Sequence, residues 1–290
     1  MQLGLPHFIE VKFQSTPYRE EANMLVVCNG MIRSGSTMQY NLVRTLLEKQ
    51  NIGRANGFFD NSNYPLTEDQ IDQWVNDDYY HVIKMHDLHP RIERIAKNEK
   101  SDILKICYIY RDIRDVAASA KIKWNLEGKN LIASLNRTIY NYYKIKEIKN
   151  ILFQRYETVI TSLSQSVKEI ANFLNINLEE EIINRVANEC LIVNLKKYSR
   201  KPTRLFLKKF FSLKKFIPAE LKKLLKDTFH IKSIVYDKKT LLHPRHISEN
   251  GGLIGKWIVV LNDYEKNIIT DRYKNWLTET GYLRENSLNG

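Results

Sequence analysis

A short apolar run, a turn with two glycines and an amphipathic helix constrain the fold of this chain more than any other stretch. Residues 24–28 form an apolar run of strand length, and Gly30 and Gly35 lie in the turn that follows it. Apolar side chains in residues 40–47 then repeat at helical spacing, which predicts a helix that begins near Ser36. A strand, a glycine turn and a helix N-terminus together expose backbone N–H groups and the positive end of the helix dipole. This stretch therefore predicts an anion-binding loop.

The spacing of the loop is close to that of the nucleoside triphosphate P-loop, G-x4-G-K-[ST]. Ser36 stands in place of the lysine of that motif, and Arg33 is the only cation in the loop. The loop is therefore expected to bind phosphate or sulfate without the lysine that contacts a γ-phosphate. A strand-to-helix turn that needs two glycines for purely structural reasons is the alternative that this stretch alone leaves open.

Further strand-like runs alternate with predicted helices along the chain. This alternation argues for an α/β fold, with a parallel sheet that helices cover on both faces. Ligands of such sheets bind beyond the carboxyl ends of the strands, where the sequence places Lys84, His86 and Arg111. Residues 51–66, rich in Asn, Gly and Asp, are expected to form a loop. The predicted strands are 80–85, 103–110 and 151–156, and the predicted helices include 90–95, 130–149, 162–174 and 179–195.

Two helix starts carry cap signals. Thr67 is expected to cap a helix, with Gln70 reaching back to complete a capping box. Either Asp112 or Asp115 is expected to cap the helix that follows the strand at 103–110.

Length and composition limit the class of protein. With 290 residues, 43% of them hydrophobic, the chain is long enough for one substantial core, and we expect a single α/β domain over residues 1–290. It contains no run of about 18 apolar residues, and its first twenty residues lack the apolar segment of a secretory signal. The three cysteines are far apart and are expected to be reduced. These features favour a cytoplasmic protein.

The net charge of +12 is concentrated in one segment. Residues 196–245 contain sixteen Lys or Arg and three Asp or Glu, a surplus of 13 positive charges, so the rest of the chain is about neutral. Within it, residues 204–229 alternate apolar residues with lysine pairs. Two interpretations stay open, namely cap helices that pack on the body and a basic surface that contacts an anionic membrane or a polyanion. The sequence contains no known nucleic-acid-binding motif, so nucleic acid is not an expected partner.

Four motifs occur in the order in which they occur in the sulfotransferases that use 3′-phosphoadenosine 5′-phosphosulfate (PAPS). Residues 33–37 resemble the loop that binds the 5′-phosphosulfate, and residues 110–119 resemble the signature that binds the 3′-phosphate. Lys84-Met85-His86 resembles the Lys-x-His whose histidine is the catalytic base. Residues 252–257 resemble a late Gly-x-x-Gly-x-Trp segment, and Tyr156-Glu157 is similar to a pair that contacts adenine.

The resemblance extends over about residues 24–195 and 246–280. It implies a P-loop-like core, with residues 196–245 as a variable basic cap beside the acceptor site. It also implies that PAPS is the co-substrate, that 3′,5′-ADP is the product and that no metal ion is needed. The implied catalytic residues are His86, Lys84 and Arg33. The residues implied to bind PAPS are Arg33, Ser34, Gly35, Ser36, Thr37, Met38, Arg111, Ser119, Tyr156, Cys190, Ile192 and Gly252.

The sequence departs from this family in places that concern the nucleotide. Met38 stands where the classical cytosolic members have a tryptophan that stacks on adenine, and Ile113 replaces a proline. Asn250-Gly251 replace an Arg-Lys pair, which removes two cations from the 3′-phosphate.

The residues implied to be catalytic suit transfer of a sulfuryl group. A neutral imidazole at His86 can take the proton of an acceptor hydroxyl or amine, while Lys84 and Arg33 stabilise charge on the bridging oxygen. The seven histidines are scattered and no carboxylate cluster is present, so no metal site is expected. We expect a small metabolite as the acceptor. A glycan or lipid acceptor, and a P-loop kinase or NTPase that uses Mg-ATP with Asp112 in the Walker B position, are the alternatives.

Overall fold

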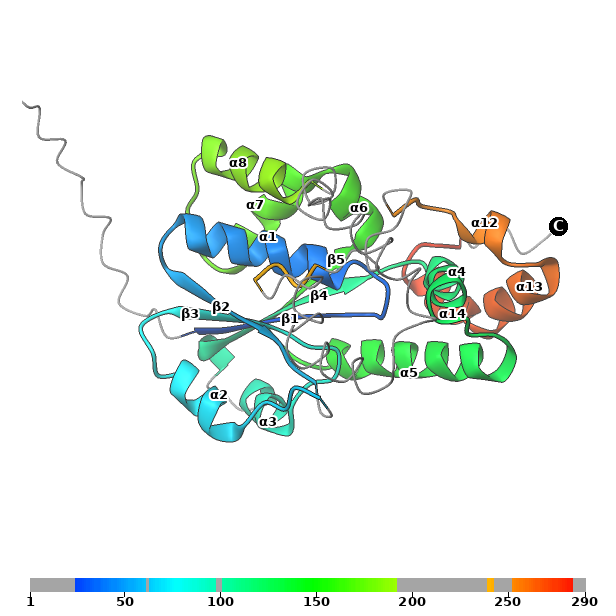
Figure 1. Cartoon of the computed structure of the whole chain (residues 1–290), viewed down its shortest axis with the longest axis horizontal. Helices are drawn as coiled ribbons and strands as arrows, with labels where there is room; N and C mark the ends of the chain where they lie inside the picture. Colours follow the sequence, from blue (N-terminus) through cyan, green and yellow to red (C-terminus); the bar gives the residue numbers. More distant parts are fainter. Residues whose placement is uncertain (1–23, 61–62, 98–100, 192–238, 243–251, 284–290) are drawn as a thin grey trace, which may run out of the picture.

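A parallel sheet forms the centre of the molecule. The computed structural model describes residues 24–60, 63–97, 101–191, 239–242 and 252–283. The strands are β1 (Met24–Gly30), β2 (Gly53–Phe58), β3 (Tyr80–Lys84), β4 (Leu104–Tyr110) and β5 (Ile151–Arg155). They form a five-stranded sheet in the order β2-β3-β1-β4-β5, with parallel pairing throughout (Figure 1). The predicted α/β class is therefore confirmed.

Helices cover both faces of this sheet. Their bounds are α1 Ser36–Lys49, α2 Glu68–Trp74, α3 Pro90–Lys97, the 3-10 helix η1 Ser101–Ile103, α4 Ile113–Trp124, α5 Gly128–Lys146, α6 Tyr156–Thr161, α7 Leu163–Phe173, α8 Glu180–Cys190, α12 Trp257–Val260, α13 Asp263–Arg272 and α14 Lys274–Glu279. Helices α1, α6, α7 and α8 lie on one face and α2, α3 and α5 on the other (Figure 1). Helices α4, α12, α13 and α14 gather beyond one end of the sheet (Figure 1).

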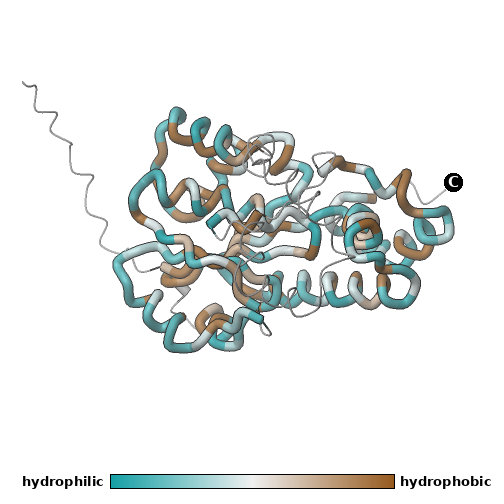
Figure 2. The backbone as a smooth tube through the Cα atoms, viewed as in Figure 1, coloured by the Kyte–Doolittle hydropathy of each residue, from teal (hydrophilic) through white to brown (hydrophobic). Residues whose placement is uncertain are grey.

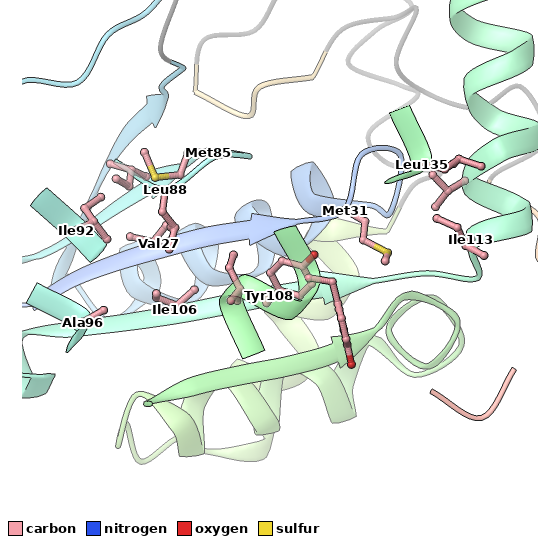
Figure 3. Close-up of a cluster of buried hydrophobic side chains, with 14 of the residues drawn as sticks. Val27, Met31, Met85, Leu88, Ile92, Ala96, Ile106, Tyr108, Ile113 and Leu135 are labelled. Carbon is pink, nitrogen blue, oxygen red and sulfur yellow. The ribbon is translucent and has the colours of Figure 1, made fainter. Parts of the chain in front are cut away.

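Each face of the sheet carries its own hydrophobic core. Every residue of β1 is buried, as expected for a central parallel strand with helices on both sides. Successive residues of a strand point to opposite faces. Val27 therefore packs into the cluster that includes Trp74 of α2, whereas Val26 packs into the cluster that includes Leu46 of α1. Figure 3 shows part of the first cluster, where Val27 and Ile106 lie between the sheet and α3. In Figure 2 the hydrophobic colour follows the central strands, and hydrophilic colour dominates the outer turns of α2.

Both helices that were predicted to carry an N-terminal cap, α2 and α4, have one. Thr67 and Gln70 form the predicted capping box at the start of α2. Of the two candidates for α4, Asp112 is the cap, because its side chain accepts from the backbone N–H of Arg114 at 2.9 Å. Asp115 has a different role, described below.

The prediction of a loop over residues 51–66 was wrong in part, because residues 53–58 form β2. Glycine and asparagine have low intrinsic preference for strands, so these residues carry no local strand signal. Pairing with β3 compensates for this weak preference. At the two ends of the pairing, the N–H of Tyr80 donates to the carbonyl of Ile52 and the N–H of Phe59 donates to the carbonyl of Lys84, each at 2.9 Å.

Part of the predicted cap lies outside the described residues. Of 196–245 only residues 239–242 are described, and both 204–229 and Ile192 fall outside. Residues 239–242 lie against α1, where Asn41 Nδ2 donates to the carbonyl of Thr240 at 2.8 Å. None of the described helices is both long enough and apolar enough to span a bilayer.

Candidate functional site

The loop between β1 and α1 has the tight geometry that its glycines predict. Gly35 is the N-cap of α1 and has φ of 90°. A Cβ at this position would lie 2.6 Å from the Tyr156 ring, so the loop requires glycine both for its φ and for space. Ser36 and Thr37 form the first turn of α1, whose backbone N–H groups have no partner within the helix. This is the geometry of an anion-binding loop.

Ser34 holds the loop from inside. Its hydroxyl lies 2.6 Å from the carbonyl of Met31 and 3.0 Å from that of Ile109, and the residue is fully buried. The backbone N–H of Ser34 also donates to the carbonyl of Met31, at 3.3 Å. Ser34 therefore shapes the loop through both its side chain and its backbone.

Arg33 reaches from this loop to α4. Its Nε donates to Ser119 Oγ at 2.9 Å, and its guanidinium lies 5.7 Å from the centre of the Trp124 ring. Its φ of 60° is uncommon for a residue other than glycine. Burial, followed by the charge of Arg111, lowers the pKa of Arg33. Two residues that the sequence placed at opposite ends of one nucleotide are thus joined directly.

Arg111, at the end of β4, forms the second cationic point. Its Nη2 donates to the carbonyl of Leu253 at 2.9 Å and lies 3.4 Å from Asp115 Oδ2. The guanidinium lies 4.3 Å from the centre of the Tyr156 ring, and Nη1 donates to the carbonyl of Arg33 at 3.4 Å. Its Nε is buried and has no hydrogen-bond partner among the described residues. A buried donor without a partner is costly, so this Nε is a candidate contact for an anion.

Asp115 ties the C-terminal segment 252–257 to α4. Its carboxylate accepts from the backbone N–H of Gly255 at 2.8 Å and of Trp257 at 3.0 Å. The hydroxyl of Tyr156 adds a second tie, because it donates to the carbonyl of Gly252 at 3.0 Å. The structure thus brings Gly252 and Tyr156 together, a contact that the sequence did not predict. It adds Asp115, which sequence reasoning considered only as a helix cap.

Lys84 and His86 contact each other at the end of β3. Lys84 Nζ lies 3.1 Å from His86 Nε2, and His86 Nδ1 lies 3.1 Å from the carbonyl of Gly30. A carbonyl can only accept, so Nδ1 carries the proton and the lone pair of the neutral imidazole is on Nε2.

Burial strongly affects the titration of this pair. It lowers the pKa of Lys84 to about 8, although the charge of a Cys28 thiolate would raise it. Burial, and then the positive charge of Lys84, lower the pKa of His86 to about 3, while the bond to Gly30 opposes the shift. His86 is therefore neutral near pH 7, and Lys84 is mostly charged.

An aromatic residue that was not predicted from the sequence lies beside this pair. Phe58, the last residue of β2, places its ring centre 4.6 Å from Lys84 Nζ and 6.0 Å from the centre of the His86 ring. Tyr64, which is exposed, packs edge-on against Phe58.

Asp87 anchors the segment that carries His86. Arg137 Nη2 donates to Asp87 Oδ2 at 2.6 Å, and Asn141 Nδ2 donates to Asp87 Oδ1 at 2.9 Å. Both partners lie on α5, four residues apart, so they share one face of the helix.

Other candidates occupy less direct positions. Met38 is buried in the core cluster under α1, and Cys190 lies at the end of α8 with its Sγ 3.6 Å from Thr45 Oγ1. Asp112 is paired with Arg114 at 2.7 Å and is buried, so its carboxylate is engaged and does not suit the Walker B role of the kinase alternative. The described residues contain no group of three His, Cys, Asp or Glu side chains placed to bind a metal.

Fold and geometry together define an α/β protein with an anion-binding loop at the carboxyl edge of its sheet. Residues 25–234 match the family model of the sulfotransferase domain, and the chain belongs to that family. The amine sulfotransferase of Oryctolagus cuniculus is 27% identical over 118 residues, which are 34% of this chain and 39% of that protein. The match therefore spans well under half of the relative's length.

Two solved structures share the fold at low sequence identity. Mouse sulfotransferase SULT7A1, complexed with PAP, has a TM-score of 0.55 at 15% identity and covers 91% of this chain and 86% of its own. Retinol dehydratase, in complex with androsterone and the inactive cofactor PAP, has a TM-score of 0.50 at 16% identity, with coverage of 90% and 82%.

Proposed function

We propose that this protein transfers a sulfuryl group from PAPS to the hydroxyl or amine of a small-molecule acceptor. The observation that carries the proposal is the Lys84–His86 pair, which lies beside the anion-binding loop. His86 Nδ1 contacts the carbonyl of Gly30, the residue that ends β1 just before the loop. PAP in the two structural neighbours supports the identity of the donor.

The residues present fit a nucleotide with two anionic ends. Arg33 lies in the loop, and Arg111 donates to the carbonyl of Arg33, so both guanidinium groups lie close to the loop. The buried Nε of Arg111 is a donor without a partner among the described residues. Arginine binds phosphate and sulfate oxygens through several N–H groups at once. The loop at residues 33–37 would hold the phosphosulfate, while Arg111 and Ser119 would hold the 3′-phosphate, with segment 252–257 beside them. Bound PAPS would supply the sulfuryl group.

His86 is assigned as the general base. Its Nδ1–H is fixed by Gly30, so Nε2 carries the lone pair that would accept the proton of the attacking hydroxyl or amine. In this structure Lys84 Nζ lies 3.1 Å from Nε2, so the acceptor would have to replace that contact. Burial, and then the charge of Lys84, lower the pKa of His86 and keep it neutral. The Lys84 ammonium can also stabilise negative charge that develops on the leaving oxygen. Because the transferring sulfuryl carries less charge than a γ-phosphoryl, these side-chain cations suffice without Mg²⁺.

The acceptor is proposed by chemical class only. One relative is an amine sulfotransferase, and one structural neighbour was solved with androsterone, an alcohol. These two proteins support either an amine or a hydroxyl as the accepting group. A glycan or lipid acceptor is the competing possibility, and turnover assays with aryl alcohols, aryl amines and oligosaccharides in parallel would separate them.

Ligand-dependent melting tests the donor assignment. We expect 3′,5′-ADP at 100 times its Kd to stabilise the protein by about 2.7 kcal/mol, a shift of several degrees in Tm for a chain of this size. Arg111→Ala should abolish most of the shift, and Mg-ATP should produce none. Stabilisation by Mg-ATP in the absence of any effect of 3′,5′-ADP would refute the proposal and restore the kinase alternative.

A further inference from the structure

The pairing of β2 with β3 contains an irregularity beside the candidate catalytic pair. Ala55 is paired with Val82, but the next pairs are Gly57 with Ile83 and Phe58 with Lys84, so Asn56 is an extra residue. Gly57 has φ of 96°, which suits a glycine next to such a bulge. We refer to residues 55–57 as the Asn56 bulge.

The bulge decides which face of the sheet Phe58 occupies. Side chains alternate along a strand, so one extra residue moves every later side chain to the opposite face. In a regular strand Gly57 would pair with Lys84, and Phe58 would point to the other face. With the bulge, Phe58 pairs with Lys84 and packs with the core cluster on the α1 side.

A buried histidine contacts the bulge from the opposite face. His81 Nδ1 lies 3.1 Å from Asn56 Oδ1, and its Nε2 lies 2.8 Å from Asp77 Oδ2. The ring is 3% exposed and stacks on Trp74 of α2 at 5.5 Å between ring centres. His81 thus joins the bulge to Asp77 in the turn after α2, and this link fixes a strand whose sequence has little strand preference.

We propose that the Asn56 bulge, held by His81 and Asp77, is a positioning device that directs Phe58 onto the Lys84–His86 pair. Phe58 is then a positioning residue, which acts through Lys84 by keeping water from its ammonium and by binding its charge with the ring face. The catalytic meaning of this device rests on the proposed function, but the link from Asn56 to Lys84 can be tested without any turnover.

The test follows the titration of Lys84 by NMR in lysine-labelled full-length protein, with the resonance identified by its loss in Lys84→Arg. The wild-type midpoint is expected at about 8. Phe58→Ala should move the midpoint up toward the ordinary lysine range, because water that reaches the ammonium stabilises its charge more than the ring face does. Asn56→Ala should produce most of the same shift, and the double variant should add little to Phe58→Ala. Phe58→Tyr, which keeps the ring, should stay close to wild type.

Thr67→Ala is the matched control, because it removes the cap of α2 without touching the bulge. It should lower the melting temperature and leave the Lys84 midpoint unchanged. An unchanged midpoint in Phe58→Ala would overturn the shielding role of Phe58. An unchanged midpoint in Asn56→Ala, or equal shifts in Asn56→Ala and Thr67→Ala, would overturn the role of the bulge. Binding of 3′,5′-ADP, measured in parallel, reports on the proposed function, so the two failures are distinguishable.

Discussion

At the scale of single residues, the orientation of the His86 ring is fixed by contacts that the three-residue motif Lys84-Met85-His86 does not reveal. The Nδ1 of His86 faces the carbonyl of Gly30, and Asn29 Nδ2 donates to the backbone carbonyl of His86 at 3.4 Å. Both partners lie on the last two residues of β1, so the strand that leads into the anion-binding loop also orients the imidazole. Loop and base cannot move independently, which is the condition for a base placed beside a bound donor.

Replacing His86 should separate catalysis from donor binding. We expect His86→Ala to lower kcat by about 10²–10⁴-fold, the usual effect of losing a general base, while the Kd for 3′,5′-ADP stays within about twofold. His89→Ala is the matched control, because that histidine lies in the same loop but its Nδ1 accepts from the backbone N–H of Arg91 at the start of α3. Steady-state kinetics and calorimetric titration measure the two effects. A His86→Ala enzyme with normal turnover would remove the base assignment.

The shifted pKa of Lys84 predicts the pH dependence of the reaction. The ammonium is present below about pH 8 and is lost as the pH rises through that value, so kcat/KM should fall on the alkaline side with a midpoint near 8. His86 protonates only near pH 3, so it should cause no acid limb above about pH 5. A bound anion stabilises the ammonium, so the limb in kcat should lie at higher pH than the limb in kcat/KM.

Lys84→Arg supplies the control for this profile, because a guanidinium keeps its charge through the whole range. The variant should be slower and should lack the alkaline limb. Persistence of the limb at its original midpoint in Lys84→Arg would assign it to another group.

At the scale of elements, segment 252–257 depends on α4 for its position. Asp115→Ala leaves the N–H groups of Gly255 and Trp257 without their acceptor. We expect a loss of about 1–3 kcal/mol in the free energy of unfolding, measured in urea. The affinity for 3′,5′-ADP should fall by about tenfold, or about 1.4 kcal/mol. The reason is that the carbonyl of Leu253, in this segment, accepts from Arg111, and the contact would be lost when the segment moves.

Asp263→Ala serves as the surface comparison, since its side chain is 93% exposed. It should change stability by no more than about 0.5 kcal/mol. Asp115→Asn keeps one oxygen acceptor and should fall between the two. If Asp115→Ala lowered stability but left the affinity for 3′,5′-ADP intact, segment 252–257 would not belong to the donor site.

Elements with local signals were predictable, and those that depend on distant partners were not. Neighbouring residues alone determine the apolar runs of β1, β3, β4 and β5 and the capping box of α2. The positions of these elements could therefore be predicted from the sequence. Strand β2 exists because β3 pairs with it, and nothing in its own composition indicates a strand. The contact of Phe58 with Lys84 depends on one extra residue in that strand, which no pattern reveals.

The motif resemblance located site residues on separate strands, but not how they contact one another. It placed Arg33 and Ser119 at different ends of the nucleotide, whereas the structure joins their side chains at 2.9 Å. It also assigned no role to Asp115 beyond a cap. Contacts between side chains more than 80 positions apart depend on the packing of α4 against the loop, and packing is not encoded in local spacing.

At the scale of the whole molecule, the net positive charge comes from residues 196–245 and not from the rest of the chain. Outside residues 196–245 the chain carries 29 Lys or Arg against 30 Asp or Glu. A body with so little net charge gives weak long-range attraction. Under the proposed function, the sheet-side cations near the donor would be Arg33, Lys84 and Arg111, which the parallel topology brings to one edge of the sheet.

That topology predicts that two distant parts of the chain respond to the donor together. Residues 30–37 and 252–257 are linked through Arg111, which contacts the carbonyls of both Arg33 and Leu253. We expect 3′,5′-ADP to slow amide hydrogen exchange in both segments with the same concentration dependence, because one ligand stabilises one joined structure. Helix α2 lies on the opposite face of the sheet and should exchange at an unchanged rate (Figure 1). In Arg111→Ala, at ligand concentrations that restore occupancy, residues 30–37 should stay protected and residues 252–257 should lose most of their protection. Protection of the loop alone in the wild-type protein would mean that the C-terminal segment takes no part in donor binding.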